Sequence, residues 1–269
     1  MATVMAEAGR PMIDVSKPNN ARVYSYLLGG KDNFAVDREA VERILIRDPG
    51  LKRRARLNRA FVTGATKRAI RAGIDQFIDL GSGLPVHPWA HEVIRLGSPL
   101  ARVAYVDSDP VVFSHTNACA AVEEGIVAAL ADIRDLDAVL AEPAVHSAID
   151  LSQPACVILA AVCHLLPPAE VAEVAAGYMR VMPAGSWLVF STEHITDLAL
   201  RAQLAKLYGV DRFYDHCQEI VASLFADLDL VAPGISEARR WLSGLGGVPA
   251  EPGQPGYMLC AAGVKPLAS

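Results

Sequence analysis

The sequence predicts an α/β protein built on an open, doubly wound and mostly parallel sheet. From about residue 74 onward, short apolar runs alternate with amphipathic segments of helical length, and this alternation indicates parallel βαβ units. The runs are nearly continuous in apolar residues, as expected for strands buried on both faces. The 269 residues suffice for one large domain with a well-covered core.

The N-terminal part of the chain has a different pattern. Residues 1–15 show no periodicity, and we expect them to be disordered. Residues 16–73 show helical spacing of their apolar residues and predict a helical cap. Residues 74–269 form the predicted α/β domain. The first helix of the cap is expected to begin at Asn20 and end at Gly29. The second is expected to have Asp37 as its N-cap and to end at Pro49, and the third to run from Leu51 to Gly73.

Seven strands and five helices are expected within the α/β domain. No helix of ordinary length separates the last two strands, and glycines and prolines cluster over 233–256. We therefore expect the final strand to be antiparallel and to lie at the sheet edge. The expected strands cover 76–80, 102–106, 126–131, 155–163, 187–191, 228–232 and 257–264, and the expected helices lie near 91–96, 110–123, 169–181, 197–208 and 213–226.

Composition limits the classes of partner. The net charge of −5 gives no basic surplus for binding nucleic acid. The basic run 52–59 is interpreted as the solvated face of a helix, and a local basic groove is the alternative. Five scattered cysteines without a two-residue spacing predict a reducing, cytoplasmic compartment and no metal site. No segment approaches the ~18 apolar residues that a membrane span requires, so no membrane partner is expected.

Residues with binding chemistry follow each of the first four predicted strands. In a doubly wound sheet, ligands bind outside the carboxyl ends of the strands, so these residues are expected to meet in one site. They are Asp79, Gly81, Ser82 and Gly83 after the first strand, Asp107 and Ser108 after the second, Asp132 and Ile133 after the third, and His164 after the fourth.

Each strand end suggests a contact to a nucleoside. Glycines let the backbone turn sharply and approach a ligand closely, although Gly-Ser-Gly alone also fits a plain turn. Asp107, some two dozen residues beyond this turn, suits two ribose hydroxyls. Asp109 is the alternative ribose ligand, but it is better interpreted as the N-cap of the next helix, with Pro110 following. Asp132 and Ile133 suit an adenine amino group and ring face.

The turn also narrows the kind of nucleoside. A dinucleotide site requires a third glycine where the helix opens, and this chain has Leu84 and Pro85 there. No Gly-x-x-x-x-Gly-Lys loop for a triphosphate occurs either. A carboxylate at Asp79 followed by Gly-x-Gly fits a nucleoside that carries an amino acid, with Asp79 near its ammonium group. S-adenosyl-L-methionine is such a nucleoside.

The segment 19–37, NNARVYSYLLGGKDNFAVD, resembles the N-terminal signature of the actinobacterial S-adenosylmethionine-dependent methyltransferase-like family, formerly a domain of unknown function. The segments 58–61, 79–85 and 105–110 match its later blocks, and the match extends through 162–164. The resemblance implies the Rossmann-like class I methyltransferase fold, with seven strands and the last strand antiparallel. It also implies that the N-terminal helices close over the cofactor.

The resemblance gives the 19–37 block a role as a lid. Glycines at the end of the first helix permit a turn, a cation there suits the methionine carboxylate, and an aromatic ring shields the sulfonium from water. The alternative is a helix C-cap followed by an ordinary loop. Arg22 or Lys31 is the predicted cation, Tyr26 or Phe34 the predicted ring, and Gly30 and Asn33 complete the predicted cofactor residues of this block.

His164 is the predicted catalytic base, because it lies where the fourth strand opens into the cleft; a packed core histidine is the alternative. Glu193 and His194 are the second choice. No Asn-Pro-Pro-Tyr-like tetrad and no Pro-Cys setting occurs, which argues against methylation of a nucleic-acid base and leaves a small-molecule acceptor. Two other functions stay open: a non-catalytic, regulatory protein that binds S-adenosylmethionine or S-adenosylhomocysteine, and an adenine-dinucleotide oxidoreductase, which Pro85 disfavours.

Overall fold

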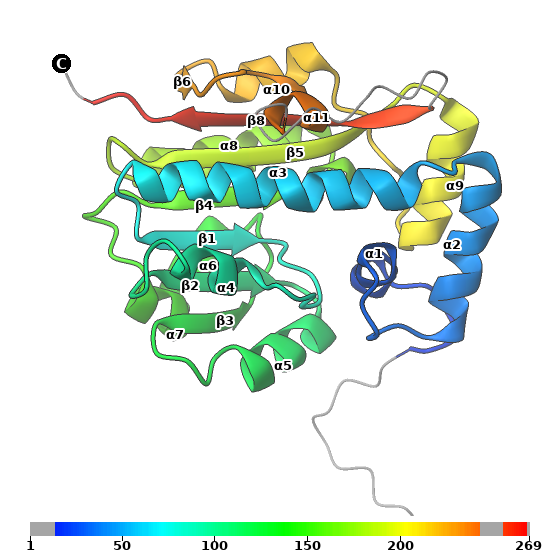
Figure 1. The fold of residues 1–269 in the computed structure, drawn as a ribbon, viewed down its shortest axis with the longest axis horizontal. Helices are drawn as coiled ribbons and strands as arrows, with labels where there is room; N and C mark the ends of the chain where they lie inside the picture. Colours follow the sequence, from blue (N-terminus) through cyan, green and yellow to red (C-terminus); the bar gives the residue numbers. More distant parts are fainter. Residues whose placement is uncertain (1–13, 243–254, 268–269) are drawn as a thin grey trace, which may run out of the picture.

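The fold is an open sheet with helices on both faces (Figure 1). The structure is a computed structural model and describes residues 14–242 and 255–267, so the expectation of disorder over 1–15 lies almost wholly outside the described residues. The strand order is β3-β2-β1-β4-β5-β8-β6, with β7 also paired to β8. The strands are β1 (Gln76–Leu80), β2 (Arg102–Asp107), β3 (Ile126–Leu130), β4 (Cys156–Ala160), β5 (Trp187–Ile195), β6 (Asp229–Leu230), β7 (Ser236–Glu237) and β8 (Gly256–Val264).

The first five strands are parallel, and β8 runs antiparallel to β5, as predicted. The expectation that β8 lies at the sheet edge is wrong, because β6 and β7 pair with its far side. This edge also explains why the sheet has eight strands rather than the seven that the resemblance implies. Pro233, which lacks an amide donor, and Gly234, at φ +79°, separate β6 from β7 and break the edge into two short strands.

Helices cover the two faces of the sheet unevenly. Helices α3, α4 and α11 pack on one face, with Phe61, Ile94 and Trp241 in its core, and α3 crosses the front of the sheet in Figure 1. The other face is covered by α6, α7, α8 and α10. The helices are α1 (Asn20–Leu28), α2 (Ala35–Arg47), α3 (Leu51–Arg71), α4 (Ala90–Arg95), α5 (Pro110–Cys119), α6 (Leu136–Ala141), α7 (Pro143–Ala148), α8 (Pro168–Val181), α9 (Leu198–Tyr208), α10 (Gln218–Leu224) and α11 (Ala238–Trp241).

Helices α1, α2 and α9 share a separate apolar cluster at one end of the sheet. Helix α1 begins at the N-cap Asn19, whose side chain accepts from the Arg22 amide, and ends at Gly29 in the left-handed region, as its sequence predicted. The prediction that Asp37 is the N-cap of α2 is wrong. The N-cap is Phe34, three residues earlier, because the Asp37 carboxylate reaches back to accept a 2.8 Å hydrogen bond from the Phe34 amide.

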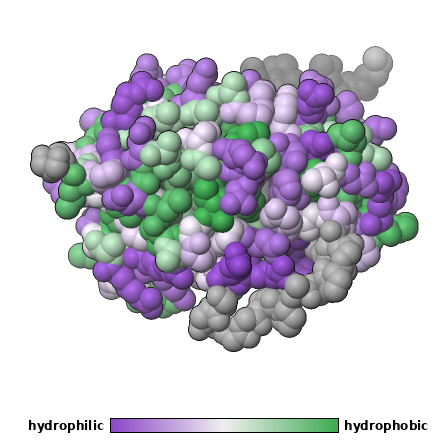
Figure 2. Space-filling view, turned by 90° about the horizontal axis from the view of Figure 1, so that it is seen from above, coloured by the Kyte–Doolittle hydropathy of each residue, from purple (hydrophilic) through white to green (hydrophobic). Residues whose placement is uncertain are grey.

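Several predicted boundaries also shift. Strand β4 stops at Ala160 because Ala161 takes a positive φ of 56°, and Cys163 lies in the short 3₁₀ helix η1 (Cys163–Leu165) rather than in the strand. The short helices α6, α7 and α11 were not predicted. Along the edge where α10 and β6 lie, hydrophilic and hydrophobic side chains are interspersed over the surface (Figure 2). Within the described residues, no helix combines the length and apolarity that crossing a membrane requires.

Candidate active site

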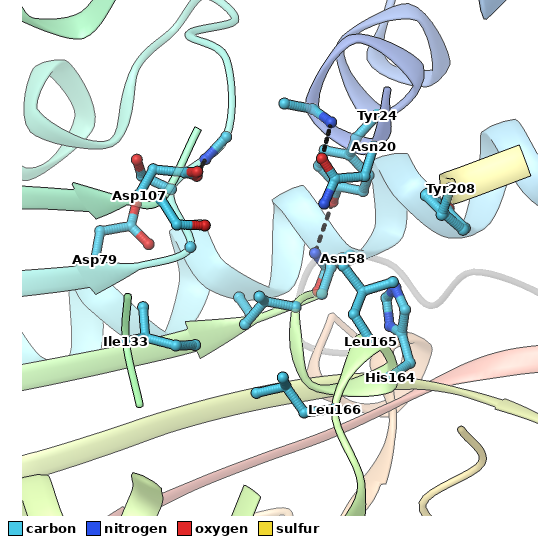
Figure 3. Close-up of a pocket in the computed structure, with 18 of the residues that line it drawn as sticks. Asn20, Tyr24, Asn58, Asp79, Asp107, Ile133, His164, Leu165, Leu166 and Tyr208 are labelled. Carbon is cyan, nitrogen blue, oxygen red and sulfur yellow. Dashed lines mark hydrogen bonds between the residues drawn. The ribbon is translucent and has the colours of Figure 1, made fainter. Parts of the chain in front are cut away.

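A cavity of about 360 Å³ lies at the carboxyl ends of the parallel strands (Figure 3). Its walls come from the ends of β1, β2, β3 and β4, together with α1, α3 and the end of α9. All nine residues predicted at the strand ends line it. They are Asp79, Gly81, Ser82, Gly83, Asp107, Ser108, Asp132, Ile133 and His164.

The glycine turn after β1 is held by the neighbouring strand. The Gly81 and Ser82 amides both donate to the Val106 carbonyl, at 2.8 and 3.2 Å. Gly81 has φ +70°, and a Cβ there would lie 2.6 Å from the Val162 side chain. Glycine is therefore required at this position both by the backbone angle and by the close approach of the loop after β4.

Asp107 is fixed at the end of β2. Its Oδ2 accepts from the Gly83 amide and its Oδ1 from the Asp109 amide, both at 2.9 Å. Burial raises the pKa of Asp107, while these two amides lower it. Asp109 caps α5 as predicted, accepting from the Val111 amide at 2.8 Å, and it also accepts from the Asn19 side chain at 2.7 Å. The capping role leaves Asp107 as the better ribose candidate.

Asp79 lies beside Asp107 in the cavity (Figure 3). Within the described residues, no side chain or amide donates a hydrogen bond to its carboxylate. Burial raises the pKa of Asp79 to about 6; the positive charge of Arg59 lowers it and the negative charge of Asp107 raises it. A buried carboxylate without a donor is costly, so Asp79 is suited to a cationic ligand group.

Arg59, on α3, lines the same cavity and was not predicted. Its guanidinium Nη2 donates to the carbonyls of Val86 (3.2 Å) and Pro88 (2.6 Å), and it forms no ion pair within 4 Å of Asp79. The interpretation of 52–59 as a solvated helix face is wrong here. It is also wrong at Arg54, which is buried and binds Asp48 through both terminal nitrogens. The sequence signals for Arg59 were the match of 58–61 to a family block and the alternative of a local basic groove over 52–59.

Asp132 and Ile133 line the cavity after β3. The Ile133 side chain is buried, as a residue packing on a ring face should be. The Asp132 carboxylate is already bound by the Arg134 guanidinium, with an Oδ2–Nη2 distance of 2.6 Å, and this hydrogen bonding lowers its pKa. Asp132 therefore has only part of its hydrogen-bonding capacity left for a ligand.

His164 lines the cavity but is poorly suited to be a base. Its ring stacks on Phe213, with centroids 4.7 Å apart, and its Nδ1 is buried without a partner among the described residues. Burial lowers the pKa of His164 to about 3, assisted by the charges of His216 and Arg54. A general base is most effective with a pKa near the working pH, which this histidine does not have.

The second pair of base candidates does not line the cavity. Glu193 is buried on β5, 3.5 Å from an Arg54 nitrogen, and burial raises its pKa. The Nδ1 of His194 lies 2.8 Å from an Asp215 oxygen. Both side chains are thus engaged outside the cavity.

The five cofactor residues predicted in the N-terminal block lie outside the cavity lining, and so does Lys31, the alternative cation. Arg22 is buried in an ion pair with Asp37, at 2.8 Å, and its guanidinium also donates to the Lys17 carbonyl. The Tyr26 hydroxyl donates to Glu42 at 2.8 Å.

The other three residues of the block hold the chain between α1 and α2. Gly30 packs against Ser25 and Val86, so that even a Cβ would lie 2.2 Å from the Ser25 hydroxyl. The Asn33 side chain donates to the Gly30 carbonyl, and Phe34 is the partly exposed N-cap of α2. The predicted lid contacts are therefore replaced by structural ones.

Helix α1 nevertheless lines the cavity, through Asn20, Ala21 and Tyr24. Arg22 and Tyr26 fall on other sides of the helix because residues two apart are rotated by about 200°. Ala21 also packs with Leu84 and Val112, which ties α1 to the glycine turn and to α5. The block thus covers the site, but with a different set of side chains.

Comparison with known proteins agrees with this geometry. A family model described as S-adenosyl methyltransferase matches residues 6–266. The solved structure of a Thermobifida fusca protein, provisionally named a methyltransferase, has a TM-score of 0.83 and 36% identity, covering 94% of this chain and 97% of its own. A DUF574 family protein from Streptomyces avermitilis has a TM-score of 0.84 and 26% identity, covering 95% and 100%.

A more distant structure shares the fold. The geranyl diphosphate C-methyltransferase of Streptomyces coelicolor has a TM-score of 0.50 and 11% identity, covering 93% of this chain and 87% of its own. The comparison with curated proteins gave no match. The match over nearly the whole length, the class I methyltransferase fold and the cavity at the strand ends lead to one conclusion: this chain belongs to the S-adenosyl methyltransferase family and is an S-adenosylmethionine-dependent methyltransferase.

Proposed function

We propose that this enzyme transfers the methyl group of S-adenosylmethionine to a small-molecule acceptor held beside the cofactor in the 360 Å³ cavity. The observation that carries the proposal is the change in lining from one end of the cavity to the other. Carboxylates occupy the ends of β1, β2 and β3, whereas the rest of the cavity is lined by Tyr24, Leu165, Leu166 and Tyr208, together with Asn58 and His164 (Figure 3). The cavity therefore offers a polar half for the cofactor and a mostly apolar half for an acceptor.

The amino-acid end of the cofactor fits Asp79 and Arg59. These opposite charges line one cavity without forming an ion pair, and the Asp79 carboxylate has no donor among the described residues. An amino acid brings an ammonium group and a carboxylate together, so it satisfies both side chains at once. Arg59 thereby takes the role that the sequence assigned to Arg22 or Lys31.

The nucleoside end fits the next two strand ends. Asp107 is held by backbone amides in a fixed orientation, which leaves lone pairs for two ribose hydroxyls. Ile133 supplies an apolar surface for the adenine ring, and Asp132 an acceptor for its amino group. Gly81, Ser82, Gly83 and Ser108 complete the cofactor wall.

The bound cofactor supplies an electrophilic methyl group on sulfur. The chain's own contribution is to align an acceptor with that group and to exclude water from it. Helix α1 performs the second task, because Asn20, Ala21 and Tyr24 cover the cavity. All five cysteines are free thiols, which supports a cytoplasmic site for this reaction.

Calorimetry with two ligands tests the cofactor placement. S-adenosylhomocysteine contains the amino acid, whereas 5′-methylthioadenosine lacks it. We expect Arg59→Gln and Asp79→Asn to weaken binding of the first ligand by about tenfold to a hundredfold, the effect of losing one charged hydrogen bond, and to leave the second unchanged. Equal effects on both ligands would remove the two side chains from the amino-acid end.

Transfer of labelled methyl tests the acceptor class. The enzyme is incubated with labelled S-adenosylmethionine and with size-separated fractions of a cell extract. We expect label in the small-molecule fraction. Label found only in protein or in nucleic acid would contradict the proposal, and cofactor binding without transfer to any fraction would identify a binding protein instead.

A further inference from the structure

A chain of hydrogen bonds with a defined direction ends on a cavity-lining tyrosine. The Ala161 amide donates to the Ser191 hydroxyl at 3.1 Å, and this hydroxyl donates to the Asn58 Oδ1 at 2.5 Å. The Asn58 Nδ2 then donates to the Tyr24 hydroxyl oxygen at 2.7 Å (Figure 3). The Ala161 amide, which also donates to the Ser191 carbonyl at 3.0 Å, occupies one lone pair of the Ser191 hydroxyl, and from this hydroxyl onward each group donates to the next.

This direction fixes the role of the Tyr24 hydroxyl. Its oxygen already accepts from Asn58, so its own hydrogen is left to donate, and no described residue accepts it. Tyr24 lines the cavity. Burial raises the pKa of Tyr24 to about 12, so the hydrogen stays on the oxygen at neutral pH. Tyr24 thus offers the cavity an oriented hydrogen-bond donor.

The position of the chain separates this donor from the cofactor wall. Ser191 is on β5 and Ala161 follows β4, whereas the proposed ribose ligand Asp107 ends β2. In the order β2-β1-β4-β5, the first and last strands are three spacings apart, or about 14 Å. Tyr24 and Asn58 therefore belong to the acceptor half, between the carboxylates and the His164–Tyr208 end in Figure 3.

The acceptor half also lacks a base. Among the described residues that line the cavity, the carboxylates follow β1, β2 and β3. The acceptor half contains His164, whose pKa is lowered to about 3, and Tyr208, whose pKa is raised well above its usual value by burial. Neither group takes a proton from a neutral hydroxyl or from an ammonium group at neutral pH.

We propose, on the basis of the proposed function, that the acceptor is an oxygen anion already ionised in solution and that Tyr24 donates a hydrogen bond to it. Asn58 and Ser191 are positioning residues for Tyr24. Carboxylates and acidic phenols share this chemistry. An oxygen lone pair forms a bond to the methyl carbon while the carbon–sulfur bond breaks, and that electron pair goes to sulfur. The two charges cancel and no proton is released, so no base is required.

The preference for an oxygen anion is tested by comparing how tightly the S-adenosylhomocysteine-loaded enzyme binds an anionic probe and a neutral probe of the same shape. The probes are benzoate with its neutral isostere benzamide, and 4-nitrophenolate with 4-nitroaniline, at mildly alkaline pH. We expect at least one anion to bind more tightly than its neutral partner. Tyr24→Phe should lower the affinity for that anion by about tenfold to a hundredfold, and the affinity for S-adenosylhomocysteine should not change. Preference for benzoate indicates a carboxylate acceptor, and preference for 4-nitrophenolate indicates a phenolate acceptor.

Two further variants make the result specific. Asn58→Leu keeps a similar volume and adds no charge, but it removes the amide that donates to the Tyr24 oxygen, so the tyrosine hydrogen is no longer held toward the cavity and the anion preference should weaken. Tyr257→Phe, on β8 and outside the cavity lining, should keep it. Circular dichroism and S-adenosylhomocysteine binding confirm that each variant is folded.

Three outcomes would overturn the proposal. In the first, the wild-type enzyme binds neither anion more tightly than its neutral partner, and in the second, Tyr24→Phe keeps that preference. In the third outcome, Tyr24→Phe weakens binding of S-adenosylhomocysteine as much as binding of the anion. The last would mean that Tyr24 serves the cofactor carboxylate. Failure of the wild-type enzyme to bind S-adenosylhomocysteine at all would instead contradict the proposed function.

Discussion

The Gly83 amide donates a 2.9 Å hydrogen bond to the Asp107 carboxylate, which joins the turn after β1 to the end of β2. The same carboxylate is the proposed ribose ligand. If the proposal holds, one side chain both shapes the glycine turn and binds the nucleoside, so a substitution at Asp107 changes the two together.

We expect Asp107→Asn to weaken S-adenosylhomocysteine binding by about a hundredfold, because the amide offers one acceptor oxygen in place of a charged pair. Calorimetry measures the effect. The matched control is Asp150→Asn, because Asp150 is exposed in the loop before β4 and bonds only to Ser152 through its side chain. Equal affinities for the Asp107 variant and the wild type would exclude Asp107 from the site.

Asp79 gives the free energy of unfolding a predictable pH dependence. Burial raises its pKa from 3.8 to about 6 in the folded state. Between these values the folded chain keeps a proton that the unfolded chain releases, so stability falls as pH rises from about 4 to 6 and stays lower above it. At 1.36 kcal/mol per pKa unit, the loss is at most about 2–3 kcal/mol.

Asp79→Asn should therefore stabilise the cofactor-free enzyme at about pH 7, and the wild-type and variant curves should converge near pH 4. Chemical denaturation across this range measures the difference between them. Cofactor binding should show the opposite trend in the wild type, since an ammonium group prefers the ionised carboxylate, so affinity rises through about pH 6. A parallel pair of stability curves would show that folding does not shift the pKa of Asp79.

The sequence predicted the strand-end residues well, for a physical reason. Strands buried on both faces need continuous apolar runs, which are visible in the chain, and all parallel strands place their carboxyl ends on one side of the sheet. Nine residues could therefore be grouped without knowing any distance. The antiparallel β8 followed from the missing helix before it. A strand near β6 was predicted over 228–232, but its pairing with the far side of β8 was not, and β7 is only two residues long and leaves no pattern.

The residues supplied by helices could not be predicted in the same way. The sequence of a basic run on α3 does not distinguish an arginine exposed to solvent, as was expected over 52–59, from one that lines the cavity, as Arg59 does. On α1, both the face bearing Tyr24 and the face bearing Arg22 are occupied by polar or aromatic groups. Only the packing of α1 against α2 and α9 decides which face meets the cavity.

Arg22 is now expected to affect stability rather than cofactor affinity. Its ion pair with Asp37 is buried on both sides, and removing one partner leaves an uncompensated buried charge. Arg22→Met should therefore lower the free energy of unfolding by about 3–5 kcal/mol, with S-adenosylhomocysteine affinity unchanged at temperatures where the variant is folded. Arg38→Met, at an exposed arginine that bonds to Asn33, is the control and should cost at most about 1 kcal/mol. Unchanged stability with a large loss of affinity would return Arg22 to the cofactor site.

His164 should remain neutral over the whole working range of the enzyme. Because burial and the nearby positive groups lower its pKa to about 3, its ring resonances should not titrate above about pH 4. Histidine-selective NMR measures this, with His164→Gln identifying the signal. The same variant keeps a polar side chain beside Phe213, against which the ring stacks, so it should retain methyl transfer within a few-fold, without a change in the pH profile. If the His164 signal titrated near neutral pH and His164→Gln abolished transfer, the histidine would be the base after all, and a neutral hydroxyl acceptor would replace the oxygen anion.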